Sequence, residues 1–361
     1  GLRQTAQNGL NAVFPPRLPK RVSVPSRPRL TPAIADVRRA VRETWDAHRV
    51  AAGDQILVAC SGGADSLALA VAAQFEGERA GVKVGAVIVE HGLQAVTKDV
   101  ASRAAQFLTD LGLAPVVVRP VEIDARAEGG LEAAARDARY EQLEFAAEAF
   151  EAKFVMLGHT LDDQAETVLL GLTRGSGPRS IAGMQTSHGI WMRPLLGIRR
   201  ATTEAFCVDS GLEFWNDPHN EDEKFTRVRI RKNVLPVLER EMGPGVAEAL
   251  ARTSEILTED LAYFESQALA EFTRLAKVGS TGIEFEIAAV AELPKVIRVR
   301  VFHKALELLG GVISRTHLVA VNDLIENWHG QKELTLPGVR VVRKGDLLTF
   351  KTTKTLTPGA C

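Results

Sequence analysis

The sequence predicts an α/β protein: a doubly wound parallel sheet, followed by a helical linker and a smaller α+β C-terminal region. In the first part of the chain, short apolar runs rich in β-branched residues alternate with alanine-rich or amphipathic stretches. Strands that alternate with helices imply right-handed crossovers and parallel pairing. Further along, one long amphipathic stretch precedes three short apolar runs, which the turn signals Pro337-Gly338 and Gly345-Asp346 separate.

Length and composition set the broad class of the protein. The chain has 361 residues and a net charge of −1, so it is long enough for several domains and is not a globally basic nucleic-acid binder. Cys60, Cys207 and Cys361 are far apart and form no Cys-x-x-Cys pair, which disfavours a zinc site or a redox pair. We therefore expect a reducing, cytoplasmic location. No apolar run is long enough to span a membrane.

We expect domain boundaries after positions 33 and 220. Residues 1–33 contain several prolines and arginines but no Asp or Glu, and they are predicted to form a flexible tail. Residues 34–220 hold the alternating strands and helices. This part begins with a helix at 34–48, where apolar residues recur every three or four positions. Residues 221–361 make up the C-terminal helical and α+β region.

The most informative motif is Ser61-Gly62-Gly63-Ala64-Asp65-Ser66, which lies between an apolar run at 56–60 and an alanine-rich run at 67–75. This order predicts a strand, a tight turn and a helix. Adjacent glycines let the backbone approach a ligand, and the first N–H groups of a helix attract an anion. The turn therefore suits a phosphate or pyrophosphate. A plain turn with a serine cap explains the residues equally well, because neither of the two best-known phosphate motifs is present.

The next elements continue the alternation. A second strand is expected at 82–89, a helix at 99–111 and a third strand at 116–121. The second strand runs into Glu90-His91. The C-terminal end of a strand in an open α/β sheet faces the ligand crevice. His91 is therefore expected either to contact a ligand or only to end the strand.

An alanine-rich helix is expected from Glu132 to Tyr140. Arg136, Arg139 and Tyr140 are three or four positions apart and share one face of it. Two interpretations stay open on the residues alone. The face is solvated, with pairs such as Glu132 to Arg136, or the two guanidinium groups face a phosphate or an RNA.

A second polar cluster follows a fourth strand at 154–157. His159 lies at the end of that strand, and Asp162, Asp163 and Glu166 lie in the first turns of the next helix. Near a triphosphate such carboxylates would hold Mg²⁺, with Asp163 as the first choice of ligand and Asp162 as the second. The alternative is that the acids only stabilise the helix dipole. Both helix starts belong to the same edge of the sheet, so we expect this cluster to face the phosphate turn.

Basic residues gather further on. Residues 174–200 contain several arginines and no acid, and positions 215–220 have the composition of a turn. Five basic residues then fall between Lys224 and Lys232, with Phe225 and Trp215 nearby. Basic residues interleaved with aromatic ones suit an RNA backbone and an unstacked base. A solvated, charged face is the competing interpretation.

The C-terminal region shows no catalytic cluster and is predicted to bind substrate. Its elements are expected as helices at 245–277, 294–310 and 315–328, and as strands at 283–287, 332–336, 339–343 and 347–351.

Taken together, the order of the motifs resembles that of the tRNA(Ile)-lysidine synthases, a family of the ATP pyrophosphatase (PP-loop) superfamily. The first motif alone is similar to the whole superfamily, and the series is far more selective. Two positions depart from the family pattern: His219 stands where the family often has Ser, and Val228 where it often has Asn. The motifs that carry the resemblance are Ser61 to Ser66, Glu90-His91-Gly92-Leu93, Glu132 to Tyr140, Gly158 to Thr167, Arg174-Gly175-Ser176-Gly177, Arg193-Pro194-Leu195-Leu196, Trp215 to Asn220 and Arg227 to Arg231.

The resemblance implies an ATP-dependent ligase that acts on a tRNA for isoleucine with a CAU anticodon. ATP would adenylate the C2 oxygen of the wobble cytidine and release pyrophosphate. The amino group of free L-lysine would then attack C2 and expel AMP, which leaves lysidine. The resemblance places ATP binding and catalysis in residues 34–220, and tRNA or substrate binding in residues 221–361. A homodimer is compatible with the sequence. The alternatives are another PP-loop tRNA-modifying enzyme, such as a thiolase, or a non-catalytic RNA-binding protein.

The resemblance also implies roles for individual residues, with ATP and Mg²⁺ as the cofactors. Catalysis is expected of Asp65, His159, Asp163 and Arg136. ATP binding is expected of Ser61, Gly62, Gly63, Ala64, Asp65, Ser66 and His91. Asp163 and Asp162 are the expected Mg²⁺ ligands. Contacts with tRNA or lysine are expected of Glu166, Arg174, Asp217, Asn220, Arg227, Arg229 and Arg231.

Overall fold

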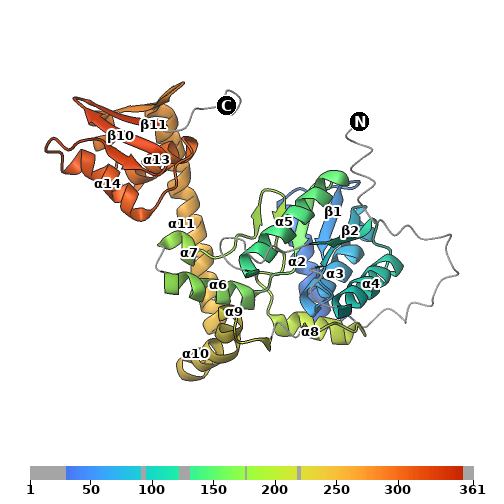
Figure 1. Cartoon of the computed structure of the whole chain (residues 1–361). Coiled ribbons are helices and arrows are strands. Elements are labelled where there is room, and N and C mark those ends of the chain that lie inside the picture. Colours follow the sequence, from blue (N-terminus) through green and yellow to red (C-terminus); the bar gives the residue numbers. More distant parts are fainter. Residues whose placement is uncertain (1–29, 91–94, 122–130, 175–176, 218–220, 353–361) are drawn as a thin grey trace. The chain divides into compact units, whose positions relative to one another are not determined.

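The computed structural model describes residues 30–90, 95–121, 131–174, 177–217 and 221–352. The chain forms two compact units, Gly1–Glu255 and Ile256–Cys361 (Figure 1). His91, His219 and Asn220 lie outside the described residues, as does nearly all of the tail expected over 1–33.

The first unit is built on a six-stranded sheet with the order β3-β2-β1-β4-β6-β5. The strands from β3 to β6 in this order run parallel, and β5 pairs antiparallel with β6 at one edge. The predicted doubly wound parallel sheet is therefore confirmed. The strands are β1 (Gln55–Ala59), β2 (Lys83–Glu90), β3 (Val116–Pro120), β4 (Phe154–Leu157), β5 (Ser187–His188) and β6 (Trp191–Met192).

Helices cover both faces of this sheet. Ile56 and Val58 of β1 pack into a core that α2, α3, α4 and α8 share, whereas Leu57 packs with α5 on the other face. A strand buried on both faces explains why its sequence is a continuous apolar run. These helices are α2 (Pro32–Ala47), α3 (Ala64–Ala80), α4 (Ala95–Asp110), α5 (Leu131–Ala149) and α8 (Arg200–Asp209).

A smaller core forms around the helix that follows β4. Leu161 and Ala165 of this helix pack against Ile230, Leu235 and Ala247. This packing joins the segment after 221 to the first compact unit, which extends to Glu255. The functional boundary expected at 220/221 stays a prediction. The elements are α6 (Leu161–Arg174), α7 (Pro178–Ile181), α9 (Thr226–Arg229), a π-helical turn (Ile230–Val234), α10 (Leu235–Met242) and α11 (Val246–Leu275).

The second unit is an antiparallel sheet of five strands in the order β7-β8-β11-β10-β9, packed with helices. Phe285 lies edge-on to Phe302 and Phe350 in its core, with ring centroids 6.0 Å and 5.6 Å away. The predicted α+β region is confirmed. Across the described ranges, no helix combines the length and the apolar character needed to cross a membrane. The elements are β7 (Lys277–Gly279), β8 (Gly282–Glu286), α12 (Ile287–Ala291), α13 (Lys295–Leu308), α14 (Arg315–Glu326), β9 (Leu334–Leu336), β10 (Val339–Lys344) and β11 (Leu347–Thr352).

Candidate active site

The turn between β1 and α3 wraps around the hydroxyl of Ser66. Ser66 Oγ accepts a hydrogen bond from the Ser61 backbone N–H at 3.1 Å and donates to the Gly63 carbonyl at 3.0 Å. Gly62 has a φ of 84°, a value that favours glycine. Gly63 is the N-cap of α3 and has no side chain, so nothing on that residue covers the first N–H groups of the helix. These groups can face an anion.

The second polar motif lies directly against this turn. A Cβ atom placed on Gly158 would be 3.2 Å from backbone atoms of both Asp65 and Ser66, a tighter contact than most side chains make, so the two backbones approach closely here. The start of α6 therefore meets the start of α3, although many residues separate them in the sequence. Residues from both motifs line a cavity of about 280 Å³, among them Ser61, Asp65, His159 and Asp163.

Two carboxylates of this cavity share one arginine. Asp163 Oδ1 lies 2.8 Å from Arg200 Nη2, and Asp65 Oδ2 lies 3.5 Å from Arg200 Nε. Their other oxygens accept from neutral donors. The Thr160 backbone N–H and hydroxyl donate to Asp163 Oδ2 at 2.8 Å and 2.9 Å, and the Thr203 hydroxyl donates to Asp65 Oδ1.

The two acids differ in pKa. Burial raises the pKa of Asp65 to about 6, although the Thr203 hydroxyl and Arg200 favour its charged form. Burial also disfavours ionised Asp163, but Arg200 and the Thr160 donors outweigh it and hold the pKa of Asp163 below the ordinary value. Asp163 is therefore a fixed anion, while Asp65 can gain a proton just below neutral pH.

Glu166 is fully buried and is surrounded by arginines. Its carboxylate accepts from Arg231 Nε at 2.7 Å and from Arg231 Nη2 at 3.1 Å. Arg200 Nη1 and Arg227 Nε lie 3.5 Å and 3.8 Å away. Glu166, expected to contact tRNA or lysine, thus pairs with arginines here. It orients Arg231, which lines the cavity.

Asp162 faces a different set of partners. Its Oδ2 accepts from the backbone N–H of Arg200 at 2.7 Å, at the start of α8, and its Oδ1 lies 3.2 Å from Arg199 Nη1. Asp162 does not line the cavity of about 280 Å³. Asp162, one of the two expected Mg²⁺ ligands, thus lies against the start of α8 and outside this cavity.

The donor set suits Mg²⁺ only as a site shared with a ligand. In the part of the chain that the structure describes, no group of three or more His, Cys, Asp or Glu residues is arranged to hold a metal ion. Mg²⁺ usually takes one or two carboxylates and completes its shell with phosphate oxygens and water. Asp65 and Asp163 line the same cavity and are the carboxylates that fit this requirement.

His159 and Arg139 bring polar atoms to the same cavity. Burial lowers the pKa of His159 to about 3, so its ring is neutral at pH 7. Its Nδ1 is buried and has no hydrogen-bond partner within the described ranges. Burial also lowers the pKa of Arg139, whose guanidinium nevertheless stays charged.

The two arginines of α5 therefore differ in position. Arg136, expected to be catalytic, is exposed, and its guanidinium lies over the Tyr140 ring at 4.9 Å from the centroid. Arg139, which shares that helix face, is the one that lines the cavity. The sequence spacing put both on one face but could not tell which of them reaches the ligand side.

The remaining expected contact residues lie around this centre. Arg174 is exposed at the end of α6, and Arg229 is exposed on α9, where it donates to the carbonyls of Glu223 and Lys224 at 2.7 Å and 2.9 Å. Arg227 donates to Thr167 Oγ1 at 3.0 Å. Asp217 is half-buried.

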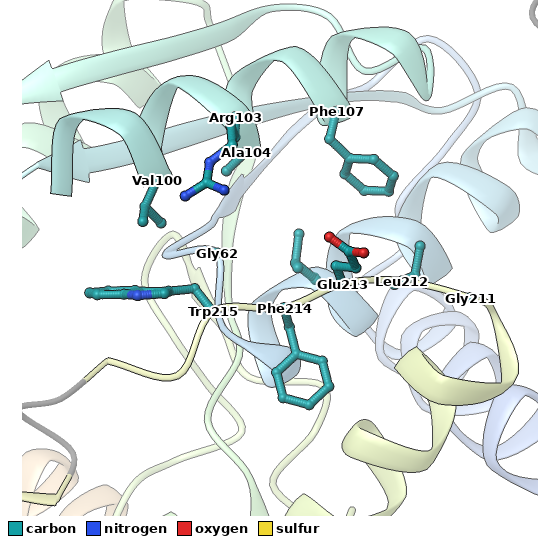
Figure 2. Close-up of a pocket in the computed structure, with 11 residues that line it drawn as sticks. Gly62, Val100, Arg103, Ala104, Phe107, Gly211, Leu212, Glu213, Phe214 and Trp215 are labelled. Atoms are coloured by element: carbon teal, nitrogen blue, oxygen red, sulfur yellow. The ribbon is translucent and has the colours of Figure 1, made fainter. Parts of the chain in front are cut away.

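A second pocket, of about 370 Å³, adjoins the phosphate turn between α4 and residues 211–215. Figure 2 shows the indole ring of Trp215 beside Gly62, with Arg103 and Phe107 reaching into the same space from α4. The Trp215 backbone N–H donates to the Gly62 carbonyl at 3.0 Å. Trp215 lines both pockets, so it forms the wall between them.

Comparison with known proteins agrees with this geometry. Residues 35–238 match the family model of the PP-loop domain, and residues 285–349 match that of the TilS substrate binding domain. The chain is 53% identical over 305 residues to the tRNA(Ile)-lysidine synthase of Leifsonia xyli subsp. xyli, covering 84% of this chain and 91% of that protein. For the tRNA(Ile)-lysidine synthase of Thermobifida fusca the identity is 44% over 320 residues, covering 87% and 96%.

The chain belongs to the tRNA(Ile)-lysidine synthase family. The resemblance drawn from the motifs is thus confirmed. Among solved structures, the fold is similar to that of the U34-tRNA thiolase NcsA from Methanococcus maripaludis with its [4Fe-4S] cluster. That comparison has a TM-score of 0.54 and 18% identity and covers 63% of this chain and 79% of the thiolase. At this identity it shows the fold alone.

The described cysteines of this family member do not resemble a reactive pair. Cys60 and Cys207 are both buried and unpaired. Burial raises the pKa of the Cys60 thiol and raises that of Cys207 to about 12. Thiols of this kind are poor nucleophiles and poor metal ligands at neutral pH. Cys361 lies outside the described residues.

Proposed function

We propose that this protein ligates free L-lysine to C2 of the wobble cytidine of tRNA(Ile) with a CAU anticodon, at the expense of ATP. The products are lysidine, AMP and pyrophosphate, and the intermediate is an adenylated cytidine. The observation that carries the proposal is the cavity that the phosphate turn and the start of α6 build together in a member of this family.

The chemistry of adenylation explains the composition of the cavity. Pyrophosphate leaves as a polyanion, so the site needs donors placed where negative charge develops. The N–H groups at the start of α3, the Ser61 hydroxyl and the Arg139 guanidinium supply such donors. Neutral His159 adds a polar ring without adding charge. The loop is held in shape by Ser66, whose hydroxyl bonds to both ends of the turn.

Asp65 and Asp163 would hold the Mg²⁺ that accompanies ATP. Bound there, the ion would neutralise phosphate charge and orient the triphosphate. The Thr203 and Thr160 hydroxyls each donate to one oxygen of these carboxylates, and the other oxygen of each faces Arg200, which also lines the cavity. The Glu166 and Arg231 pair supports the wall beside them.

Lysine must be recognised by its charged ends. Glu204 lines the cavity and is exposed, and within the described residues no ion pair engages its carboxylate. Every other acid at the cavity contacts an arginine. We infer that Glu204 binds an ammonium group of free lysine.

The tRNA needs a surface for its backbone and a site for a base drawn out of the anticodon loop. Arg174 and Arg229 are exposed and can contact phosphates. Trp215 is half-buried at the edge of the cavity and offers a ring for stacking. The segment matched as a TilS substrate binding domain belongs to the second unit, which we propose binds another part of the tRNA.

Incorporation of labelled lysine into a tRNA(Ile) transcript tests this function. The full chain, with ATP and Mg²⁺, is expected to label a transcript with a CAU anticodon and not one in which the wobble cytidine is replaced by uridine. Labelling that does not depend on the cytidine, or the absence of labelling with an enzyme that binds ATP, would contradict the proposal. Ser66→Ala is the matched variant, and it should lower adenylation far more than tRNA binding.

A further inference from the structure

Arg200 brings one guanidinium to carboxylates from two helices. It contacts Asp163 of α6 at 2.8 Å, and Asp65 of α3 at 3.5 Å. A third carboxylate, that of Glu166, lies 3.5 Å from Arg200 Nη1. The backbone of Arg200 is itself fixed, because its N–H donates to Asp162 Oδ2 at 2.7 Å. The side chain is thus held at the cavity from both ends.

Each of the two cavity carboxylates also has a hydrogen-bond donor other than Arg200. The Thr203 hydroxyl holds one oxygen of Asp65, and the Thr160 backbone and hydroxyl hold one oxygen of Asp163. Each acid then turns its second oxygen to the same guanidinium. Two carboxylate oxygens that converge in this way can form a binding site for a cation. In this structure the Arg200 guanidinium occupies that site.

A divalent cation that enters the cavity without a nucleotide is repelled by the Arg200 guanidinium. Arg231 adds to this repulsion, because its Nη2 lies 3.7 Å from Asp163 Oδ1. ATP changes the balance, because its phosphates attract both the guanidinium and the metal ion. We propose that Arg200 is the resident counter-ion of Asp65 and Asp163 and makes divalent-cation binding depend on ATP. This inference rests on the proposed use of ATP. It adds an order to the reaction: the metal ion enters with the nucleotide and not before it.

Direct binding of Mn²⁺ tests the inference, with the full chain and without nucleotide, tRNA or lysine. Mn²⁺ is measured by electron paramagnetic resonance of the free ion. Arg200→Gln, which removes the charge, is expected to bind Mn²⁺ at least about tenfold more tightly than the parent. The reason is that a unit positive charge at short range repels the ion enough to weaken its affinity by about this factor. Arg200→Lys keeps the charge and should bind as weakly as the parent.

Arg199→Gln is the matched control. Arg199 precedes Arg200 and pairs with Asp162, Glu239 and Glu248 at 3.2 Å, 3.8 Å and 3.4 Å, and it does not line the cavity. Its loss should leave Mn²⁺ binding unchanged. Adding Asp163→Asn to Arg200→Gln should abolish the gain. A gain that survives this second substitution places the ion elsewhere and overturns the proposal.

The parent protein supplies a test that needs no variant. It should bind Mn²⁺ tightly only when a non-hydrolysable ATP analogue is present. Equally tight binding without the analogue refutes the role of Arg200, as does an Arg200→Gln protein that is folded but gains no affinity. These titrations use neither tRNA nor lysine. A failure of the proposed ligase reaction would instead appear in the labelled-lysine assay, so the two failures are distinguishable.

Discussion

The substitution Glu166→Gln should destabilise the first unit strongly. Glu166 is fully buried, and its two oxygens accept from Nε and Nη2 of Arg231. Glutamine has nearly the same shape, but its NH₂ group would oppose a guanidinium donor, and three arginines would lose their shared anion. Breaking one partner of a buried ion pair costs about 3–5 kcal/mol. We expect about 3 kcal/mol in the free energy of unfolding, because the Arg231 side chain is still 28% exposed.

Urea unfolding followed by tryptophan fluorescence measures this cost. Trp45, Trp191 and Trp215 belong to the first unit and Trp328 to the second, so a Trp328→Phe background confines the signal to the first. The comparison of midpoints at constant slope shows whether stability alone has changed.

The control for this experiment is Glu43→Gln, the same chemical change on the surface of the same unit. Glu43 is 70% exposed and lies 4.0 Å from Arg39. Its loss should change the free energy of unfolding by less than about 0.5 kcal/mol. If Glu166→Gln unfolds at the same urea concentration as Glu43→Gln, the buried ion cluster does not contribute as its geometry indicates.

Four further predictions concern the cavity and the RNA surface. Because the pKa of Asp65 is raised to about 6, the folded state keeps a proton on Asp65 between the ordinary pKa of an aspartate and pH 6, where the unfolded state has lost it. The free energy of unfolding should therefore fall as pH rises through this window. Urea midpoints measured from pH 4 to pH 7.5 should show this fall, and Asp65→Asn should remove the part of it that Asp65 causes. Arg139→Gln should weaken ATP binding by about tenfold or more, as a lost charge-assisted phosphate contact does, and more than Arg136→Gln; calorimetric titration that finds equal losses would contradict the placement of Arg139. Glu204→Gln should raise the KM for lysine by about tenfold at an unchanged ATP affinity, and an unchanged KM would remove it from the lysine site. Arg229→Gln should lower the slope of log affinity for tRNA against log salt concentration by about one unit. An unaltered slope would mean that Arg229 contacts no phosphate and is an ordinary solvated surface residue.

The sequence alone determined the architecture and the place of the site. Apolar runs of strand length alternate with helical periods, and this local pattern suffices for the strands β1 to β4 and for their helices. It could not reveal β5 and β6, because two-residue strands such as Ser187–His188 carry no period of their own. The motifs at 61–66 and 158–167 pointed to one edge of the sheet, since parallel strands place both helix starts there.

Only the tertiary structure decided which acidic side chain pairs with which arginine. Asp162, Asp163 and Glu166 look alike in the sequence, yet one caps α8, one faces the cavity and one is buried under arginines. Their partners Arg200 and Arg231 come from segments far along the chain, and no local pattern encodes that meeting. Ion pairing depends on distance and burial, which the folded chain sets. The sequence pattern could therefore identify the three acidic residues as site candidates, but it could not distinguish their positions and partners.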